Sequence, residues 1–469
     1  MSTGVTEKDA SEATDYTREL AEFSLDLSHG DLPVDIVDLA RLFTLETLSH
    51  MVAATRTRVA HVVGDYVREL GAKPEAAVVG MGFRTTAAEA AYVNGTLAHG
   101  DELESYAPLA GSCMIPPVAA GLAVGDWLES PGDQYLAAMV AGVEMSGRLG
   151  TAGLGGPDRG FMGISLVGPA GATVTAAKLI GLDVEQLRNA LGVALPFGGG
   201  TTRNTGFMAH IHEAGVPSRI GVWAAIIASR GFTACPDYLD GRYSWGDQFA
   251  GGGGRGYIPE ALTEGLGASY FIQTSGAAPK KYGSCAATHA GIDGLVDLMT
   301  EHDLGPDDIA TVDLRVSPFF RRICHIDEPR DAEQAKFCFR QALGGVLVGG
   351  IPELPYLHAF TDSAATDPRY VAARQRVTVS VDPQQQDVRI FDPNTVTVTL
   401  PDGRTFSKTV EPSKVRGRHE APLTVEERTR IARNAMLPVL GAERADAVIS
   451  MVDELERHTI RELMSLTEG

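Results

Sequence analysis

Residues 167–180 read VGPAGATVTAAKLI, and this stretch points most directly to the fold of the chain. Lys178 is its only charged residue, and most of the other positions hold glycine, alanine or threonine. A helix that is apolar nearly all round is expected in the middle of a bundle. Small side chains let neighbouring helices approach closely, so the sequence predicts a large helical domain around this segment.

Helical patterns continue on both sides of this stretch. In residues 33–54, Ile36, Leu39 and Phe43 recur at helical spacing and mark one buried face. Further helices are expected at residues 87–98, 117–127, 134–149, 184–195 and 217–230. We therefore predict an all-helical domain made of residues 16–267 together with residues 414–469, following a polar, disordered N-terminus at residues 1–15.

The pattern changes from helical to alternating after residue 267. Residues 395–400 read TVTVTL, and the turn Pro401-Asp-Gly-Arg leads into a second strand at residues 405–410, which is a hairpin signal. Alternation also appears at residues 311–316 and 376–381, and helices are expected in this region at residues 288–301 and 331–348. The sequence therefore predicts a smaller α+β domain at residues 268–413, inserted before the C-terminal helices, in a mostly α protein.

The composition favours two cores and a small-molecule partner. The 469 residues exceed the size at which a single core stops growing, roughly 250–300 residues. A net charge of −20 argues against nucleic acid and anionic membrane surfaces, because both attract basic proteins. No apolar run is long enough to predict a membrane-spanning helix. The five cysteines form no CxxC pair and no signal peptide precedes them, so we expect a cytoplasmic location.

Three polar segments stand out as candidates for chemistry, and the first is residues 94–104. A predicted helix ends there in a loop that holds His99, Glu102 and Glu104. Neighbouring carboxylates raise each other's pKa, which suits proton transfer. The alternative interpretation is a solvated acidic loop.

The other two segments are residues 210–215 and residues 279–285. His210 and Glu213 precede an apolar helix whose N-terminus offers free N–H groups to an anion, with the alternative that they only cap that helix. Lys280 and Lys281 lie where the two domains meet, a common place for small-molecule sites, with the alternative of a surface linker. No HExxH motif, Cys/His quartet or EF-hand loop is present, and the spacing of His210 and His212 is poor for a shared metal site on a helix.

These segments also carry a resemblance to a known family. Their order, with the markers Ile115-Pro-Pro, Gly142-Val-Glu-Met-Ser-Gly-Arg and Ala176-Ala-Lys-Leu-Ile-Gly-Leu-Asp, resembles the MmgE/PrpD family along almost the whole chain. That family includes 2-methylcitrate dehydratase, cis-aconitate decarboxylase and iminodisuccinate epimerase. The resemblance implies a helical domain with an α+β lid, a homodimer, and catalysis without a metal or an organic cofactor.

Several positions depart from the family pattern. His99 and Lys280 match it, whereas His210 stands in place of a lysine. The other substituted positions are Glu102, Glu104, Tyr106, Leu109-Ala110, Met162 and Glu213. Two of these substitutions replace a histidine by apolar residues. A pocket with fewer cations suits a substrate less anionic than methylcitrate, since each unpaired buried carboxylate is costly.

The resemblance and these residues together indicate a lyase of the dehydratase type that abstracts a proton alpha to a carbonyl or carboxylate. His210, Lys280 and Glu102 are the expected catalytic residues. Substrate contacts are expected from His99, Glu104, Tyr106, Met162, Arg203, Glu213 and Lys281. An isomerase, epimerase or cyclase would use the same proton chemistry, and a non-catalytic ligand-binding homologue is the third alternative. In an enzyme, the three catalytic side chains should converge on one site.

Overall fold

The computed structural model describes residues 15–108, 110–251, 255–277, 279–385, 393–418 and 420–468. The disorder expected for residues 1–15 therefore lies outside the described residues, except at Asp15, whose side chain caps the first helix. Leu109, the first residue of the substituted pair Leu109-Ala110, also lies outside the described residues.

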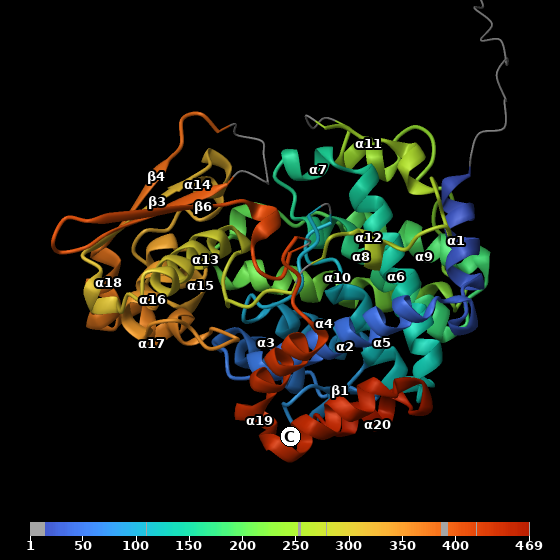
Figure 1. The fold of residues 1–469 in the computed structure, drawn as a ribbon. Helices are drawn as coiled ribbons and strands as arrows, with labels where there is room; N and C mark the ends of the chain where they lie inside the picture. The colour runs from blue at the N-terminus through green and yellow to red at the C-terminus, as the bar shows by residue number, and fades with distance from the viewer. Residues whose placement is uncertain are drawn as a thin grey trace, which may run out of the picture.

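The larger part of the molecule is a bundle of helices around α8 (Gly163–Ile180), as the quoted stretch predicts (Figure 1). This helix packs against α10 (Met208–Ala228), α6 (Gly132–Ala152) and α5 (Ile115–Leu128). Within the described residues, α8 is the one helix long and apolar enough to span a membrane, and 78% of it is buried inside the molecule. Such burial is typical of the central helix of a bundle.

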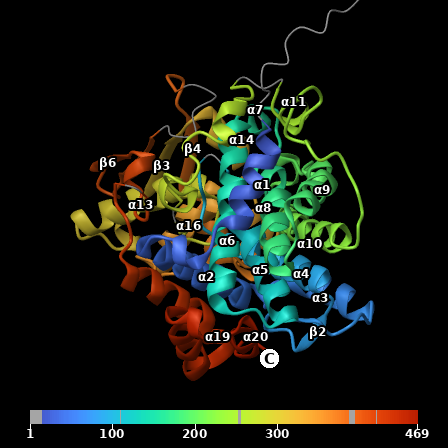
Figure 2. The ribbon, with the colours of Figure 1, turned by 90° about the vertical axis from the view of Figure 1, so that its right-hand side faces the viewer.

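The remaining helices surround this centre. They are α1 (Tyr16–Asp26), α2 (Val34–Ala54), α3 (Arg58–Glu69), α4 (Ala87–His99), α7 (Gly155–Asp158), α9 (Val184–Ala194), α11 (Trp245–Phe249) and α12 (Phe271–Thr274). A short hairpin of β1 (Ala76–Val78) and β2 (Phe83–Thr85) lies between α3 and α4. The C-terminal helices α19 (Val425–Asp453) and α20 (Ile460–Ser465) return to this bundle, where α19 packs on α2 and α20 on α5 (Figure 2).

The smaller part holds a four-stranded sheet with helices packed against it. The strands β3 (Thr311–Val316), β4 (Val377–Val381), β5 (Asn394–Thr399) and β6 (Thr405–Val410) lie in the order β4-β3-β5-β6. The predicted hairpin is confirmed, with Thr399 opposite Thr405, and β4 pairs in parallel with β3. The accompanying helices are α13 (Ala286–Glu301), α14 (Pro318–Ile323), α15 (Ala332–Ala335), α16 (Phe339–Gly349), α17 (Asp362–Thr366) and α18 (Pro368–Gln375). The expected fold class, mostly α with a smaller α+β part, is confirmed.

Each part has its own hydrophobic core. The first core still includes Phe271 and Ile272 of α12, and the second begins at Tyr282. The chain therefore crosses from one core to the other within the nine residues between Ile272 and Tyr282. Lys280 and Lys281 lie on this crossing, which puts both lysines between the two cores.

Helix α10 begins earlier than the sequence predicts. The pattern suggested a start at Pro217, but the helix runs from Met208 straight through this proline. A proline inside a helix leaves the carbonyl four residues before it without its N–H partner. Here Ser165 Oγ of α8 donates to that carbonyl, the one of Glu213, at 3.1 Å. His210 consequently lies in the first turn of α10 rather than in a loop before it.

The helix expected at residues 331–348 is divided into α15 and α16. Cys338 stands between them, and its Sγ accepts the backbone N–H of Gln341 at 3.3 Å, which begins α16 as a new helix. A thiol in a capping role has little signature in sequence, since Ser, Thr, Asp and Asn are the usual caps.

Candidate active site

Two tightly packed helices and two non-helical segments supply the polar side chains of one buried cluster. His99 is the last residue of α4, and His210 lies in the first turn of α10. The two helices approach closely at Gly95 and Gly215, where an added Cβ would lie 2.5 Å from Ser218 Oγ and 2.3 Å from Tyr92 O, respectively. The loop after α4 adds Glu102 and Glu104, and the crossing segment adds Lys280.

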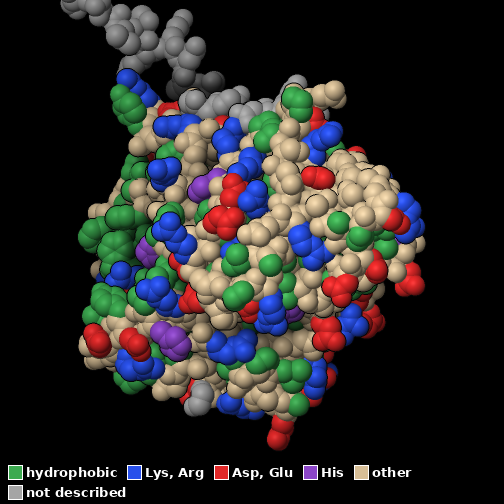
Figure 3. Space-filling model, turned by 90° about the vertical axis from the view of Figure 1, so that its left-hand side faces the viewer, with side chains coloured by type: hydrophobic (Ala, Val, Ile, Leu, Met, Phe, Trp, Pro, Cys, Tyr) green, Lys and Arg blue, Asp and Glu red, His purple; other side chains and the backbone are tan. Residues whose placement is uncertain are grey.

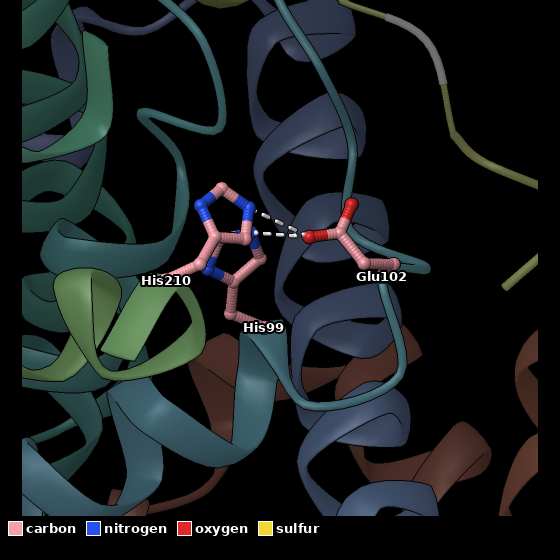
Figure 4. A group of neighbouring side chains, drawn as sticks. All are labelled: His99, Glu102 and His210. Atoms are coloured by element: carbon pink, nitrogen blue, oxygen red, sulfur yellow. Dashed lines mark hydrogen bonds and ion pairs between the residues drawn. The ribbon is translucent and has the colours of Figure 1, made fainter. Parts of the chain in front are cut away.

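The carboxylate of Glu102 lies at the centre of this cluster. Its Oε1 is 3.1 Å from His99 Nε2 and 3.0 Å from His210 Nε2. Figure 4 shows the two imidazole rings, which come from different helices, facing this one oxygen. Glu102 has a φ of 53°, a left-handed conformation that costs a non-glycine residue about 1 kcal/mol or more. The loop therefore holds a strained backbone that aims this side chain at the two histidines.

Lys280 completes the cluster from the crossing segment. Its Nζ donates to Glu102 Oε2 and to Glu104 Oε1, both at 2.6 Å. Glu104 Oε1 also accepts the hydroxyl of Ser112 at 2.9 Å. The side chains of Glu102, Glu104 and Lys280 are all at least 95% buried. Two carboxylates and an ammonium group are thus held away from water in direct contact with one another.

Burial and mutual attraction compete in setting the charges of this cluster. Burial raises the pKa of Glu102, but the positive charges of Lys280 and His99 outweigh it, and the net pKa lies well below its ordinary value. Burial lowers the pKa of Lys280 and of His99, yet Glu102 and Glu104 raise both above their ordinary values. Each group therefore stabilises the charged form of its neighbours.

Five of the expected site residues form no hydrogen bond or ion pair with the buried cluster of His99, Glu102, Glu104, His210 and Lys280 in the described part of the chain. Arg203 is exposed in a turn, and Met162 is half-buried at the start of α8. Glu213 is buried and accepts from Asn204 Nδ2 at 2.8 Å. Lys281 turns the other way, to Asp293 in the smaller part. Tyr106 is half-buried, and its phenol is close enough to Lys280 for that charge to act on its pKa.

Arg418 is a residue at this site that sequence reasoning missed. Its guanidinium lies over the ring of Tyr106, 5.5 Å from the centroid. Burial lowers the pKa of Arg418, and it has no carboxylate partner among the described residues. No pattern around residue 418 indicates this role, because only the return of the chain after β6 brings it to Tyr106.

His50 and Cys285 are two more residues near the cluster that the sequence did not suggest. His50 lies on α2, and burial lowers its pKa to about 4 even though Glu46 and Glu104 oppose this. Cys285 precedes α13 and is half-buried, and its thiol is near enough to influence the pKa of Lys280.

A cavity of about 480 Å³ opens beside the cluster, between the turn from α2 to α3 and the smaller part of the molecule. Its wall includes Asp101, which precedes Glu102 in the chain, and Met208, which lies two residues before His210. Arg56, Arg58 and Lys336 also line it. Lys336 Nζ donates to the carbonyl of Gly100 at 2.6 Å, and this bond ties the smaller part to the loop that carries Glu102. Figure 3 shows the smaller part's side of the molecule, where Lys and Arg side chains lie among Asp and Glu.

Comparison with known proteins divides the chain at the same crossing segment, although the C-terminal family model also covers α19, which packs on the larger part. The model of the MmgE/PrpD N-terminal domain matches residues 18–256, and the model of the MmgE/PrpD C-terminal domain matches residues 282–457. The "Cis-aconitate decarboxylase" of Homo sapiens is 24% identical over 92% of this chain and 89% of its own length. That of Mus musculus is 25% identical over 90% and 86%. The "Cis-aconitate decarboxylase-like protein oryM" of Aspergillus oryzae is 26% identical, and the match spans 64% of each chain.

Proposed function

The chain belongs to the MmgE/PrpD family, and from that premise we propose that it is a lyase of the dehydratase type that works by proton abstraction without a cofactor. The observation that carries this proposal is the convergence of His210, Glu102 and Lys280. Glu102 Oε1 lies 3.0 Å from His210 Nε2, and Glu102 Oε2 lies 2.6 Å from Lys280 Nζ. These groups are a base, a carboxylate that orients it, and a fixed positive charge. Such a set suits removal of a proton alpha to a carbonyl or carboxylate.

His210 acts as the base through Nδ1. Its Nε2 faces Glu102, and a hydrogen bond there requires the ring proton on Nε2, because ionised Glu102 can only accept. The lone pair then lies on Nδ1, which is buried and has no hydrogen-bond partner among the described residues. When Nδ1 takes the substrate's proton, Glu102 stabilises the imidazolium that forms.

Lys280 stabilises the negative charge that the departing proton leaves on the substrate. An ammonium group has three N–H donors, and Glu102 and Glu104 occupy two of them. The third donates to the enolate oxygen. In an elimination, the protonated His210 then gives its proton to the leaving hydroxyl group, so that water departs and the base is restored.

The charges of the site favour a substrate with few carboxylates. Lys280 is already balanced by two buried glutamates, so it has little charge left for an additional carboxylate. Arg418 is the cation near Tyr106 that has no carboxylate partner in the described part of the chain, and it anchors one substrate carboxylate in this proposal. A monoacid, or an acid whose other groups are amides or hydroxyls, therefore fits better than a tricarboxylate.

Deuterium exchange tests this function. Candidate hydroxy acids and amides are incubated with the protein in D₂O, and proton NMR follows deuterium entering at the alpha carbon. We expect exchange that falls by a factor of about 10² or more in His210→Ala and Lys280→Ala. His212→Ala is the matched control, because His212 lies on the same helix but faces Tyr92. Exchange that survives in His210→Ala would remove this base from the mechanism.

The products separate the alternatives. An unsaturated product indicates elimination, whereas an isomer, an epimer or a ring indicates that the proton returned to carbon. A wild-type protein that binds members of the panel but exchanges none of them would point to a ligand-binding homologue.

We also propose that the protein is a cytoplasmic homodimer. All five cysteines are unpaired, which supports a reducing compartment. An apolar surface on α10 and on the 3₁₀ turn after α9 supports self-association: Phe197 and Trp223 are 55% and 42% exposed and form an edge-to-face pair. Contiguous exposed apolar surface marks sites of protein–protein contact.

A further inference from the structure

The three side chains in Figure 4 are also a set of metal-ligand atoms. Glu102 Oε1 lies 3.1 Å from His99 Nε2 and 3.0 Å from His210 Nε2, and all three atoms lie within 4.8 Å of one another. Zinc ligands at about 2.0–2.1 Å in a tetrahedral arrangement lie about 3.3 Å from one another. The two edges from Glu102 Oε1 therefore lie within a few tenths of an ångström of this separation, and the third edge, between the two imidazole nitrogens, is no longer than 4.8 Å.

The chemistry of the donors indicates which cation they would take. Two imidazole nitrogens and one carboxylate oxygen suit zinc and its neighbours in the first transition row, whereas magnesium and calcium prefer oxygen ligands alone. Three protein ligands with one further open position are a common zinc arrangement. The site is buried, and two carboxylates, Glu102 and Glu104, lie in contact with the single ammonium group of Lys280. A histidine that binds a metal must be neutral, so a cation bound here would meet one net negative charge from these three groups.

We propose that His99, Glu102 and His210 bind a divalent transition-metal cation of the zinc type, and that this cation inhibits the enzyme. The inhibitory part rests on the proposed function, in which Nδ1 of His210 is the base. A cation bound to Nε2 holds His210 in its other neutral tautomer, in which the lone pair lies on Nε2 and the ring proton on Nδ1. His210 can then no longer accept a proton from the substrate, and Glu102 is drawn to the cation.

Metal binding is measured first, on the full-length protein after chelator treatment and dialysis. Equilibrium dialysis against Zn²⁺, with metal analysis of both chambers, should give one tightly held ion per chain. Loss of a direct ligand should weaken zinc binding more than about 100-fold, since loss of a mere outer-shell partner already costs 10–100-fold. This is the result expected for His99→Asn and for Glu102→Gln.

Two controls separate this site from adventitious binding. His212→Asn removes a histidine two residues from His210 that contacts Tyr92 instead, and Cys235→Ser removes an exposed thiol. Both variants should bind zinc as the wild type does. Co²⁺ bound to the wild-type protein should show the intense visible absorption of a four-coordinate N/O site, a readout that does not depend on the folding of any variant.

Deuterium exchange then tests inhibition separately from binding. The chelated protein should exchange the substrate's alpha proton, one equivalent of Zn²⁺ should suppress this, and chelator should restore it. No tight ion, or binding that is unchanged in both His99→Asn and Glu102→Gln, would overturn the site. Exchange that requires zinc would overturn inhibition and make the metal a cofactor. A chelated protein that never exchanges but binds zinc at these residues would leave the site standing and remove the proposed function.

Discussion

At the scale of single residues, the cluster depends on charges that are buried together. Lys280 is 95% buried in its side chain, and so are the two carboxylates that it contacts. Removing one partner of a buried ion pair typically costs about 3–5 kcal/mol, because the other charge is left uncompensated. In the proposed mechanism, the same low-dielectric surroundings strengthen the interaction of Lys280 with a developing enolate. The mechanism therefore relies on the same contacts that stabilise the fold.

His50 gives a prediction for the pH dependence of stability. Its pKa is about 4 in the folded chain and 6.5 as the ordinary value. Above pH 6.5, His50 is neutral in both the folded and the unfolded chain, and its contribution to stability does not change with pH. As the pH falls from 6.5 toward 4, the unfolded chain takes up a proton that the folded chain refuses, so stability is lost. Between pH 7 and pH 5 this amounts to about 2 kcal/mol.

The His50→Asn variant should not show the part of the fall in the free energy of unfolding between pH 7 and pH 5 that comes from His50. Urea unfolding followed by circular dichroism at pH 7 and pH 5 gives the two free energies of unfolding for each protein. We expect the wild type to lose about 2 kcal/mol more than the variant over this interval. Equal losses in the two proteins would show that His50 is protonated in the folded chain as readily as in the unfolded chain.

At the scale of elements, the contact between α4 and α10 sets the distance between the two histidines. An added Cβ at Gly215 would lie 2.2 Å from Thr96 Oγ1 and 2.3 Å from the carbonyl oxygen of Tyr92. The hydroxyl could rotate away, but the backbone oxygen could move only with its helix. The absence of a side chain at this position is therefore what lets His99 and His210 reach the same carboxylate.

Gly215→Ala should accordingly affect both stability and chemistry. Overpacking costs about 1–3 kcal/mol in a well-packed interior, and the separation of the helices should slow deuterium exchange. Gly199→Ala is the control, since a Cβ there meets nothing within 4 Å. The measurements are urea unfolding and the exchange rate. A Gly215→Ala protein with wild-type values in both would mean that the helix pair is more compliant than its contacts indicate.

At the scale of the whole molecule, the active site lies where the two cores meet, and the proposed dimer surface lies elsewhere on the bundle. Trp223 and Phe197 flank a small apolar group on α9 and α10 that includes Ile220 and Ile227 and is separate from the main core. Covering this surface in a homodimer would bury aromatic side chains that are now exposed to water.

Light scattering coupled to size-exclusion chromatography tests this surface. The wild type should have about twice the 49.7 kDa mass of the chain, and Trp223→Glu should shift it to the mass of one chain, because a buried unpaired carboxylate is costly. Tyr66→Glu changes a more exposed aromatic residue on α3, 56% exposed against 42% for Trp223, and should remain dimeric. A Trp223→Glu protein that stays dimeric would exclude this surface as the interface.

Periodicity and turn chemistry were sufficient to predict most elements of the fold. The apolar stretch around Val174 could only be buried in a bundle, and Pro401-Asp-Gly-Arg could only turn a hairpin. The sequence pattern failed to predict two features, the start of α10 at Met208 and the division between α15 and α16 at Cys338, for the same reason. Both depend on a hydrogen-bond partner, Ser165 Oγ in one case and a cysteine Sγ in the other, and such partners have weak signals or none in the local pattern.

Local motifs were sufficient to predict the family and the residue types available for chemistry, because such motifs do not depend on how the chain packs. Which of these residues meet depends on tertiary packing. His99 and Glu102 are three residues apart, but His210 lies 108 residues and Lys280 178 residues from Glu102, and their contact depends on how α4, α10 and the crossing segment pack. In the linear sequence, His210 and His212 are the histidine pair whose closeness suggests a shared metal site. Packing instead joins His210 to His99 and turns His212 toward Tyr92.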